Sequence, residues 1–241
     1  MSSLLVTRAA GVGWIRLNRP EKRNAIDHAT RIALEAAFAE LDADPSIRVV
    51  VLTGEGSAFC AGVDLTDAPA VGPLEAKPLV APLDDFTKPV LAAVNGPAVG
   101  GGFELALACD MRIASETATF SLPEVRLGSL PGSGGTQRLS GAVAAKLLFT
   151  AEPIDAREAL RAGIVSDVVP TDELLPLAEH LATRVALNAP LSLQAAKRAF
   201  RAAPDGRELE RELWAFLSTT ADRAEGRAAF RDKRPPKFTG R

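Results

Sequence analysis

Short apolar runs alternate with amphipathic stretches along the first half of the chain, which is the pattern of an α/β fold. Residues 6–17 mix apolar and polar positions around Gly11 and Gly13, and this predicts a β-hairpin. Asp27 is a candidate helix N-cap, because apolar residues at helical spacing follow it. Those residues are Ile32, Leu34, Ala37, Phe38 and Leu41.

Three short apolar runs predict buried parallel strands, at residues 48–53, 89–95 and 111–114. A helix that starts near Gly101 would connect the last two. Strands that alternate with helices predict an α/β layer with right-handed crossovers.

After Gly128 the pattern becomes mainly helical. Helices are predicted at 136–150, 155–162, 174–187 and 191–202, with only 164–169 extended between them. A long amphipathic helix is predicted at 208–231, broken near Gly226, and the basic, Pro-rich tail KRPPKFTGR is poorly suited to continue it. The Pro- and Ala-rich segment 68–82 breaks any helix, so we expect a mobile loop there.

Composition and charge narrow the class of protein. The 241 residues suit one or two domains, and 47% hydrophobic with 24% charged residues is ordinary for a soluble globular protein. A disordered chain, a collagen-like fibre and a disulfide scaffold are excluded. Because 28 Lys+Arg balance 30 Asp+Glu, no net field recruits nucleic acid or an anionic membrane, and we expect neither as a partner.

The N-terminus, MSSLLVTR, has neither a charged leader nor a long apolar run, and no apolar stretch approaches the about 18–20 residues that cross a bilayer. Cys60 and Cys109 lack partners at metal-ligand spacing and suit reduced, packed thiols, so we expect a soluble cytoplasmic protein. His28, in the first turn of a helix, and His180, on a helix face, favour surface or packing roles and no metal site.

Familiar catalytic motifs are absent from the sequence: it has no Gly-x-Ser-x-Gly, no Walker loop and no dinucleotide-binding glycine motif after a strand. Without a suitable histidine base, little would activate Cys60 or Ser133 as a nucleophile.

Two glycine-rich segments follow predicted strands, at 54–65 and 95–110. The glycines at 100–102 open the predicted helix, where backbone can approach a ligand closely and N–H groups favour negative charge. Close packing of helix on strand, or a simple N-cap turn, explains the same glycines.

Two glutamates lie in apolar surroundings close to these glycines. Glu104 stands in the first turn of the predicted helix, and Glu124 follows Pro123 in the stretch FSLPEVRLG. A glutamate among apolar residues suits a tuned acid or base. The structural alternatives are that Glu104 complements the helix dipole and that Glu124 is a solvated loop charge.

Several motifs follow one another along essentially the whole chain. They are LNRPEKRNAI (17–26), AFCAGVDL (58–65), KPVLAAVNGPAVGGGFELALACD (88–110), FSLPEVRLGSLPGSGGTQRL (120–139) and ADRAEGRAAFRDKRPPKF (221–238). In this order they closely resemble the crotonase superfamily, and within it the enoyl-CoA hydratases. The resemblance implies an α/β fold with a ββα spiral core, residues 1–186, which binds a CoA thioester. It also implies a helical C-terminal region, residues 187–241, that builds homotrimers or homohexamers.

The resemblance also implies catalytic residues. Ala61 and Gly101 match the positions whose N–H groups form the oxyanion hole for the thioester oxygen. Glu104 and Glu124 match both catalytic glutamates of the hydratases: the first would activate water, and the second would exchange the α-proton. Gly128 matches a glycine beside the second glutamate.

Further matches concern the CoA part of the substrate. The turn made by Ala61, Gly62, Val63 and Asp64 matches the one that follows the CoA and its adenine. Phe230 and Lys233 match C-terminal residues that contact the CoA nucleotide, often from a neighbouring subunit, although Lys237 is an alternative to Lys233.

Together these matches imply a lyase that reversibly adds water, in a syn-type addition, to a trans-2-enoyl-CoA and gives a 3-hydroxyacyl-CoA in fatty acid β-oxidation. We expect no cofactor, because coenzyme A is part of the substrate. An enoyl-CoA isomerase, another crotonase-type acyl-CoA enzyme, and a non-catalytic CoA-binding or assembly protein remain alternatives. The segment between Leu65 and Lys88 is short and Pro-rich where the family often has a helix lining the acyl pocket, so the acyl chain length stays open.

Overall fold

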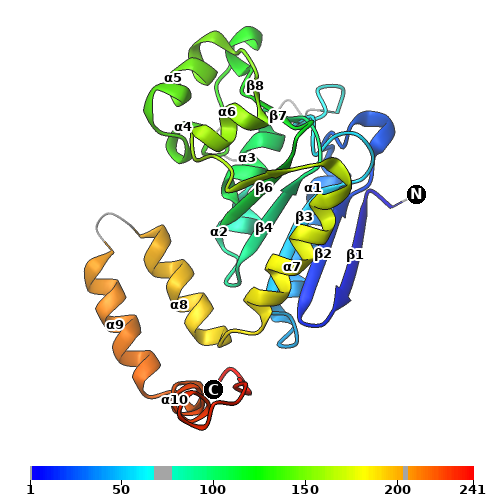
Figure 1. The fold of residues 1–241 in the computed structure, drawn as a ribbon. Coiled ribbons are helices and arrows are strands. Elements are labelled where there is room, and N and C mark those ends of the chain that lie inside the picture. The colour runs from blue at the N-terminus through cyan, green and yellow to red at the C-terminus, as the bar shows by residue number, and fades with distance from the viewer. Residues whose placement is uncertain (1, 68–77, 203–205) are drawn as a thin grey trace.

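A computed structural model describes residues 2–67, 78–202 and 206–241 of the chain. Its main sheet has the strand order β1-β2-β3-β4-β6-β9 (Figure 1). The bounds are β1 Leu4–Ala9, β2 Val12–Leu17, β3 Val49–Gly54, β4 Val90–Val94, β6 Met111–Ser115 and β9 Asp167–Val169. β1 and β2 pair antiparallel, and every later pair is parallel, with Val51 opposite Leu91 and Ala92 opposite Arg112.

A second, smaller sheet extends the fold beyond the C-terminal end of β4. It contains β5 (Ala98–Val99), β7 (Thr119–Ser121) and β8 (Ile154–Asp155). β5 pairs parallel with β7, and β7 pairs antiparallel with β8. The chain therefore passes from the main sheet into a second layer before the helix α3 begins.

Helices cover both faces of the main sheet. Their bounds are α1 His28–Ala43, α2 Ala81–Asp84, α3 Gly101–Ala108, α4 Gly135–Arg138, α5 Gly141–Thr150, α6 Ala156–Arg161, α7 Leu174–Ala186, α8 Pro190–Arg201, α9 Arg207–Ser218 and α10 Ala221–Asp232. Short 3-10 helices lie at η1 Pro20–Lys22, η2 Glu124–Leu127 and η3 Thr171–Glu173.

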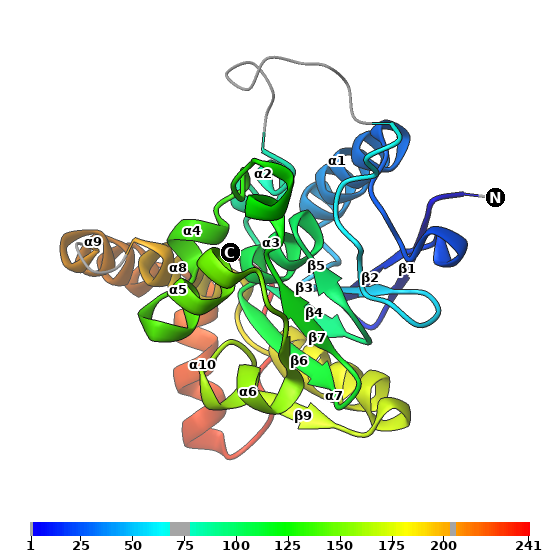
Figure 2. The same cartoon turned by 90° about the horizontal axis from the view of Figure 1, so that it is seen from above.

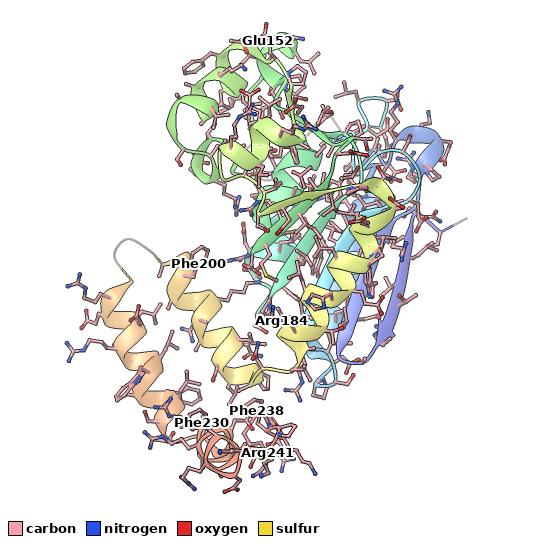
Figure 3. All side chains as sticks on the ribbon, viewed as in Figure 1. Glu152, Arg184, Phe200, Phe230, Phe238 and Arg241 are labelled. Atoms are coloured by element: carbon pink, nitrogen blue, oxygen red, sulfur yellow. The ribbon has the colours of Figure 1, made fainter. Side chains whose placement is uncertain are left out.

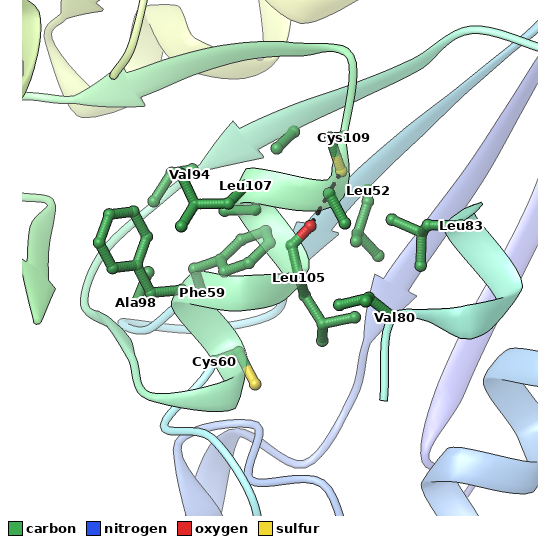
Figure 4. Close-up of a cluster of buried hydrophobic side chains, with 14 of the residues drawn as sticks. Leu52, Phe59, Cys60, Val80, Leu83, Val94, Ala98, Leu105, Leu107 and Cys109 are labelled. Carbon is green, nitrogen blue, oxygen red and sulfur yellow. Dashed lines mark hydrogen bonds between the residues drawn. The ribbon is translucent and has the colours of Figure 1, made fainter. Parts of the chain in front are cut away.

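The alternation of side chains along β3 explains why the sheet needs cover on both faces. Val50 and Leu52 belong to the large core that also holds α1 and α3, whereas Val49 and Val51 belong to a smaller core beneath α7. Figure 1 shows α7 lying across β2, β3 and β4. Figure 4 shows part of the large core, where Phe59 and Leu105 are fully buried and the Cys109 thiol donates to the Leu105 carbonyl.

The structure confirms the predicted hairpin, the three parallel strands and the start of α3 at Gly101. Asp27 is the N-cap of α1, and its side chain accepts a hydrogen bond from the Thr30 N–H. Of the apolar residues at helical spacing, Ile32 is 53% exposed, whereas the others are buried: Leu34, Ala37, Phe38 and Leu41. The helix predicted at 136–150 is in fact two, α4 and α5, because the chain becomes extended at Leu139 and buries that side chain.

The structure also corrects the predicted position of the break in the C-terminal helices. The chain turns between α9 and α10, where the Thr220 hydroxyl caps α10 by accepting from the Arg223 N–H. Gly226 lies inside α10, and a Cβ there would make only an ordinary contact, 3.5 Å from the Phe238 ring, so the helix continues through this glycine. The tail itself is non-helical, as predicted.

Most of the predicted loop at 68–82 lies outside the described residues. Its last two residues, Ala81 and Pro82, correct the prediction that the whole segment breaks helices, because they begin the short helix α2. A proline fits there since the first turn of a helix needs no N–H from it.

Helices α8, α9 and α10 extend away from the sheet in Figure 1. Ion pairs fix α8 to the core: the carboxylate of Asp110, just after α3, lies 3.0 Å from Lys197 Nζ and 2.9 Å from Arg201 Nη2. Large apolar side chains on these helices are exposed, among them Phe200, Trp214, Phe216 and Phe230, and Figure 3 labels the first and last of them. Within the described residues, no helix is both long and apolar enough to span a bilayer.

Candidate active site

The segment at residues 60–64 lies against the start of α3, and backbone contacts hold it there. Val99 donates its N–H to the Cys60 carbonyl, at 2.9 Å. A Cβ on Gly102 would overlap that carbonyl oxygen, and a Cβ on Gly62, whose φ is +90°, would lie 2.7 Å from the Val99 carbonyl oxygen. The two glycines therefore let two main chains approach to a distance that side chains would prevent.

The N–H group of Gly101 is available at this contact. Gly101 is the first residue of α3, and the first N–H groups of a helix have no acceptor within it. A Cβ built on Gly101 would lie 3.7 Å from the Val63 backbone nitrogen, so the two N–H groups are neighbours.

The direction of the other N–H groups shows which residue of the 61–64 turn can act with Gly101. Ala61 donates to the Arg23 carbonyl at 2.9 Å, and Asp64 donates to the Ile26 carbonyl at 2.9 Å. The Gly62 N–H faces the Cys60 sulfur. Among the residues that the structure describes, Val63 and Gly101 have no acceptor for their N–H groups.

The prediction that Ala61 is an oxyanion donor is therefore wrong, because its N–H is already engaged by Arg23. The free donor is two residues further on, at Val63. The sequence contains one signal for this shift, the glycine at position 62, which takes a positive φ of +90° between the two positions. That signal can be interpreted only once the partners of Ala61 and Asp64 are known.

Glu104 lies in the first turn of α3 and is only 3% exposed. Its Oε1 accepts two backbone hydrogen bonds, from the Ser133 N–H at 2.7 Å and the Gly135 N–H at 2.9 Å. No partner for Oε2 is found among the described residues. One oxygen thus fixes the carboxyl group while the other stays available.

Glu124 begins η2 and is half-buried beside the glycine that precedes α3. A Cβ on Gly100 would lie 3.0 Å from Glu124 Oε1. Oε2 is buried, and no hydrogen-bond partner for it exists in the part of the chain that the structure describes. Burial raises the pKa of this carboxyl group, and the negative charge of Glu104 raises it further.

The start of α3 therefore brings together two free N–H groups and two carboxyl groups. Helices α2, α3 and α4 lie side by side around it, as Figure 2 shows from above. Developing negative charge on an oxygen between the Val63 and Gly101 N–H groups would be stabilised, with a proton donor and a proton acceptor close by.

Two other residues that the sequence predicts to contact CoA, Asp64 and Gly128, have structural contacts of their own. Asp64 is 8% exposed and lies 3.2 Å from Arg19. Its pKa is lowered mainly by the Thr66 hydroxyl and N–H, and also by Arg19, so the carboxylate fastens the turn together. Gly128 caps η2 in the left-handed conformation, with φ +69°.

Phe230 and Lys233 do not reach this site within one chain. Both belong to the end of α10, which lies at the opposite end of the molecule from α3 in Figures 1 and 3. Phe230 is 86% exposed. Their predicted contact with CoA would require a second subunit.

The thiols and the nearby hydroxyl are structural. Burial raises the pKa of both Cys60 and Cys109 to about 12, which leaves them inert thiols. Ser133 Oγ accepts from the Leu79 N–H at 3.0 Å, and among the described residues no hydrogen bond joins this hydroxyl to a base, since the nearby Glu104 carboxylate accepts from the Ser133 backbone N–H instead. In the described ranges, no group of three or more His, Cys, Asp or Glu side chains is placed to hold a metal ion.

Comparison with known proteins agrees with this geometry. The family model described as enoyl-CoA hydratase/isomerase matches residues 7–241. A 2,3-dehydroadipyl-CoA hydratase of Escherichia coli is 43% identical over 100% of both chains. An (E)-benzylidenesuccinyl-CoA hydratase of Thauera aromatica is 44% identical over 95% of this chain and 96% of the relative.

Solved structures show the same fold. An enoyl-CoA hydratase subunit from Geobacillus kaustophilus superposes with a TM-score of 0.91 and is 40% identical, over 99% of this chain and 98% of the other. The chain belongs to the enoyl-CoA hydratase/isomerase family. The predicted fold class, a crotonase-type α/β core with a helical C-terminal region, is confirmed.

Proposed function

We propose that this protein is an enoyl-CoA hydratase, a lyase that adds water reversibly across the double bond of a trans-2-enoyl-CoA to give a 3-hydroxyacyl-CoA. The observation that carries the proposal is the cluster at the start of α3, where the free N–H groups of Val63 and Gly101 lie beside Glu104 and Glu124. Relatives about 40% identical over the full length, named as hydratases, support it.

The two N–H groups activate the substrate. They bind the thioester oxygen, and as water attacks the β-carbon they stabilise the negative charge that develops on that oxygen. A preorganised donor of this kind is worth about 3–4 kcal/mol at the transition state. Gly101 adds the favourable N-terminal end of α3.

The two carboxyl groups move the protons. Glu104 binds the attacking water through Oε2, because Oε1 is held by Ser133 and Gly135, and takes a proton as the water attacks. Glu124 gives a proton to the α-carbon. Its raised pKa suits it to hold that proton before the reaction. Both act on one face of the double bond, which gives syn-type addition.

An enoyl-CoA isomerase is the second candidate, and the family's description includes that reaction. Moving a double bond needs one group to shuttle a proton, and Glu124 alone would serve. The presence of a buried Glu104 with an available oxygen favours hydration.

An assay with crotonyl-CoA tests the proposal directly. A hydratase removes the absorbance of the conjugated thioester, an isomerase creates it from a 3-enoyl-CoA, and a CoA-binding protein without activity does neither. The panel should vary chain length and include acyl groups that carry a free carboxylate, since two relatives are named for such substrates. If neither crotonyl-CoA nor a 3-enoyl-CoA were consumed at high enzyme concentration, the protein would not be an enzyme of this kind.

The proposal includes the surroundings of the enzyme. Coenzyme A arrives with the substrate, and no other cofactor takes part. We place the reaction in fatty acid β-oxidation in the cytoplasm, where two reduced thiols are stable. The protein is a homotrimer or homohexamer, in which Phe230 and Lys233 contact CoA on a neighbouring subunit. The exposed aromatic residues of α8–α10 support assembly. Light scattering should give a multiple of three chains, and a monomer at micromolar concentration would refute it.

A further inference from the structure

The loop that holds Glu104 has little stiffness of its own. Residues 131–135 read PGSGG, and glycine-rich backbone samples many conformations. Yet the N–H groups of Ser133 and Gly135 must point at Glu104 Oε1 with distances of 2.7 and 2.9 Å. Contacts from outside the loop must therefore fix it.

The Arg138 side chain supplies such a contact by folding back over the start of its own helix, α4. Its Nη1 donates to the Ser133 carbonyl at 2.8 Å, while its Nη2 forms an ion pair with Asp84 on α2. Ser133 therefore uses both of its backbone groups, the carbonyl toward Arg138 and the N–H toward Glu104. The Arg138 guanidinium group therefore acts on the Glu104 carboxyl group through a single intervening residue, Ser133.

Gly134 makes this arrangement sterically accessible. Its φ is +94°, and a Cβ at this position would overlap Arg138 Nη1. Only glycine lets the guanidinium group lie against the loop.

The partner of Arg138 is itself anchored. Asp84 closes α2, and Arg201 of α8 donates to the backbone carbonyls of Leu83 and Asp84 at 3.0 and 3.3 Å. Leu79, shortly before α2, donates its N–H to Ser133 Oγ. The segment around α2 thus holds Ser133 in two ways. Leu79 binds its side chain directly, and Asp84 holds its backbone carbonyl through Arg138.

We propose that Arg138, held by Asp84, is a positioning residue for Glu104, an inference that rests on the proposed hydration activity. The forked guanidinium group reaches the Ser133 carbonyl and the Asp84 carboxylate with two separate nitrogens, which a lysine with a single nitrogen does not reproduce. Without this fork the two N–H groups move, and the available oxygen of Glu104 no longer meets the attacking water in line.

A double-mutant cycle tests this role. Arg138→Met should lower kcat for hydration by about 10–100-fold, the cost of a misplaced catalytic group, and leave KM within about twofold, because uniform binding of the thioester is unchanged. Arg138→Lys should retain intermediate activity. In a Glu104→Gln background, Arg138→Met should change kcat by less than about twofold, because the group that it positions is no longer a base.

Arg16→Met is the matched control. Arg16 pairs with Glu55 at 3.0 Å, and its side chain is 30% exposed against 28% for Arg138. Loss of this pair should leave kcat unchanged. If Arg138→Met does not fold, as judged by circular dichroism, Asp84→Asn takes its place in the cycle, with a smaller loss that also vanishes beside Glu104→Gln.

The outcomes distinguish a failure of the positioning role from a failure of the proposed hydration activity. If the wild-type protein is active and the kcat losses of Arg138→Met and Glu104→Gln multiply in the double variant, the positioning role is overturned, because Arg138 then acts independently of Glu104. An equal loss in Arg16→Met would overturn it as well. Wild-type protein with no hydration of any enoyl-CoA would overturn the proposed function, and the role of Arg138 in it.

Discussion

Replacing Glu104 by glutamine separates the chemistry of its carboxylate from its place in the structure. Glutamine has the same shape, and its carbonyl oxygen can accept from the Ser133 and Gly135 N–H groups as Oε1 does. The amide nitrogen then occupies the available position and cannot take a proton from water. Alanine removes the acceptor altogether and leaves two buried N–H groups without a partner.

The expected magnitudes of the two substitutions differ accordingly. Loss of a general base lowers kcat by about 10²–10⁴, so Glu104→Gln should be at least about 10²-fold slower in hydration. Each buried donor without a partner costs about 1–3 kcal/mol, so Glu104→Ala should lose about 2–6 kcal/mol of stability. For a chain of this size that lowers Tm by roughly 5–20 °C, whereas Glu104→Gln should stay within a few degrees of wild type.

Two measurements check this reasoning. Hydration of crotonyl-CoA, followed by absorbance, gives kcat and KM, and calorimetry gives Tm for each variant. Binding of the CoA ester should be kept in Glu104→Gln. Near-normal hydration by folded Glu104→Gln would show that Glu104 is not the base. An alanine variant as stable as the glutamine variant would show that the loop does not depend on Oε1.

Other predictions follow from neighbouring groups. Gly101→Pro removes the N–H at a helix position that tolerates proline, and turnover should fall about 10²–10³-fold, whereas Gly101→Ala should keep more activity; equal, near-normal rates would exclude this donor. Burial raises the pKa of Glu124 above its ordinary value of 4.5. The folded protein therefore has its full stability from this group below pH 4.5, where the carboxyl group is protonated in both states, and loses stability as the pH rises through the raised pKa. Glu124→Gln should therefore have a higher Tm than wild type at pH 8 and not at pH 4. If the Tm difference between variant and wild type were the same at both pH values, the assigned burial of Glu124 would be contradicted. With a pKa of about 12, Cys60 and Cys109 should resist iodoacetamide at pH 8 until denaturant is added, which mass spectrometry would detect; labelling of the native protein would show that they are accessible.

Features set by local pattern could be predicted from the sequence. β3 and β4 are continuous apolar runs because both faces are buried, and the sequence shows this directly. The sequence also predicts that Glu104 lies in the first turn of α3, because a run of glycines before an apolar helix marks the start of that helix. Such features depend on neighbours within a few residues.

Features set by distant contacts could not be predicted in this way. Whether Ala61 or Val63 offers a free N–H depends on hydrogen bonds to Arg23 and Ile26, which lie far away along the chain. The ion pair of Arg138 with Asp84 likewise joins two separate helices. The break before α10 is an exception, since Thr220 is a local cap that outweighs the glycine at 226.

The oxyanion pair is built from main chain, and this has a consequence for how the protein tolerates change. Any residue except proline keeps an N–H at position 63, so the side chain there is free to vary and to reshape what the substrate meets. Gly62 and Gly102 have no such freedom, because any side chain would push two backbones apart. In a library of random substitutions, position 63 should accept many residues while 62 and 102 accept almost none. The reaction type is thereby protected from mutation, and substrate preference can diverge around it.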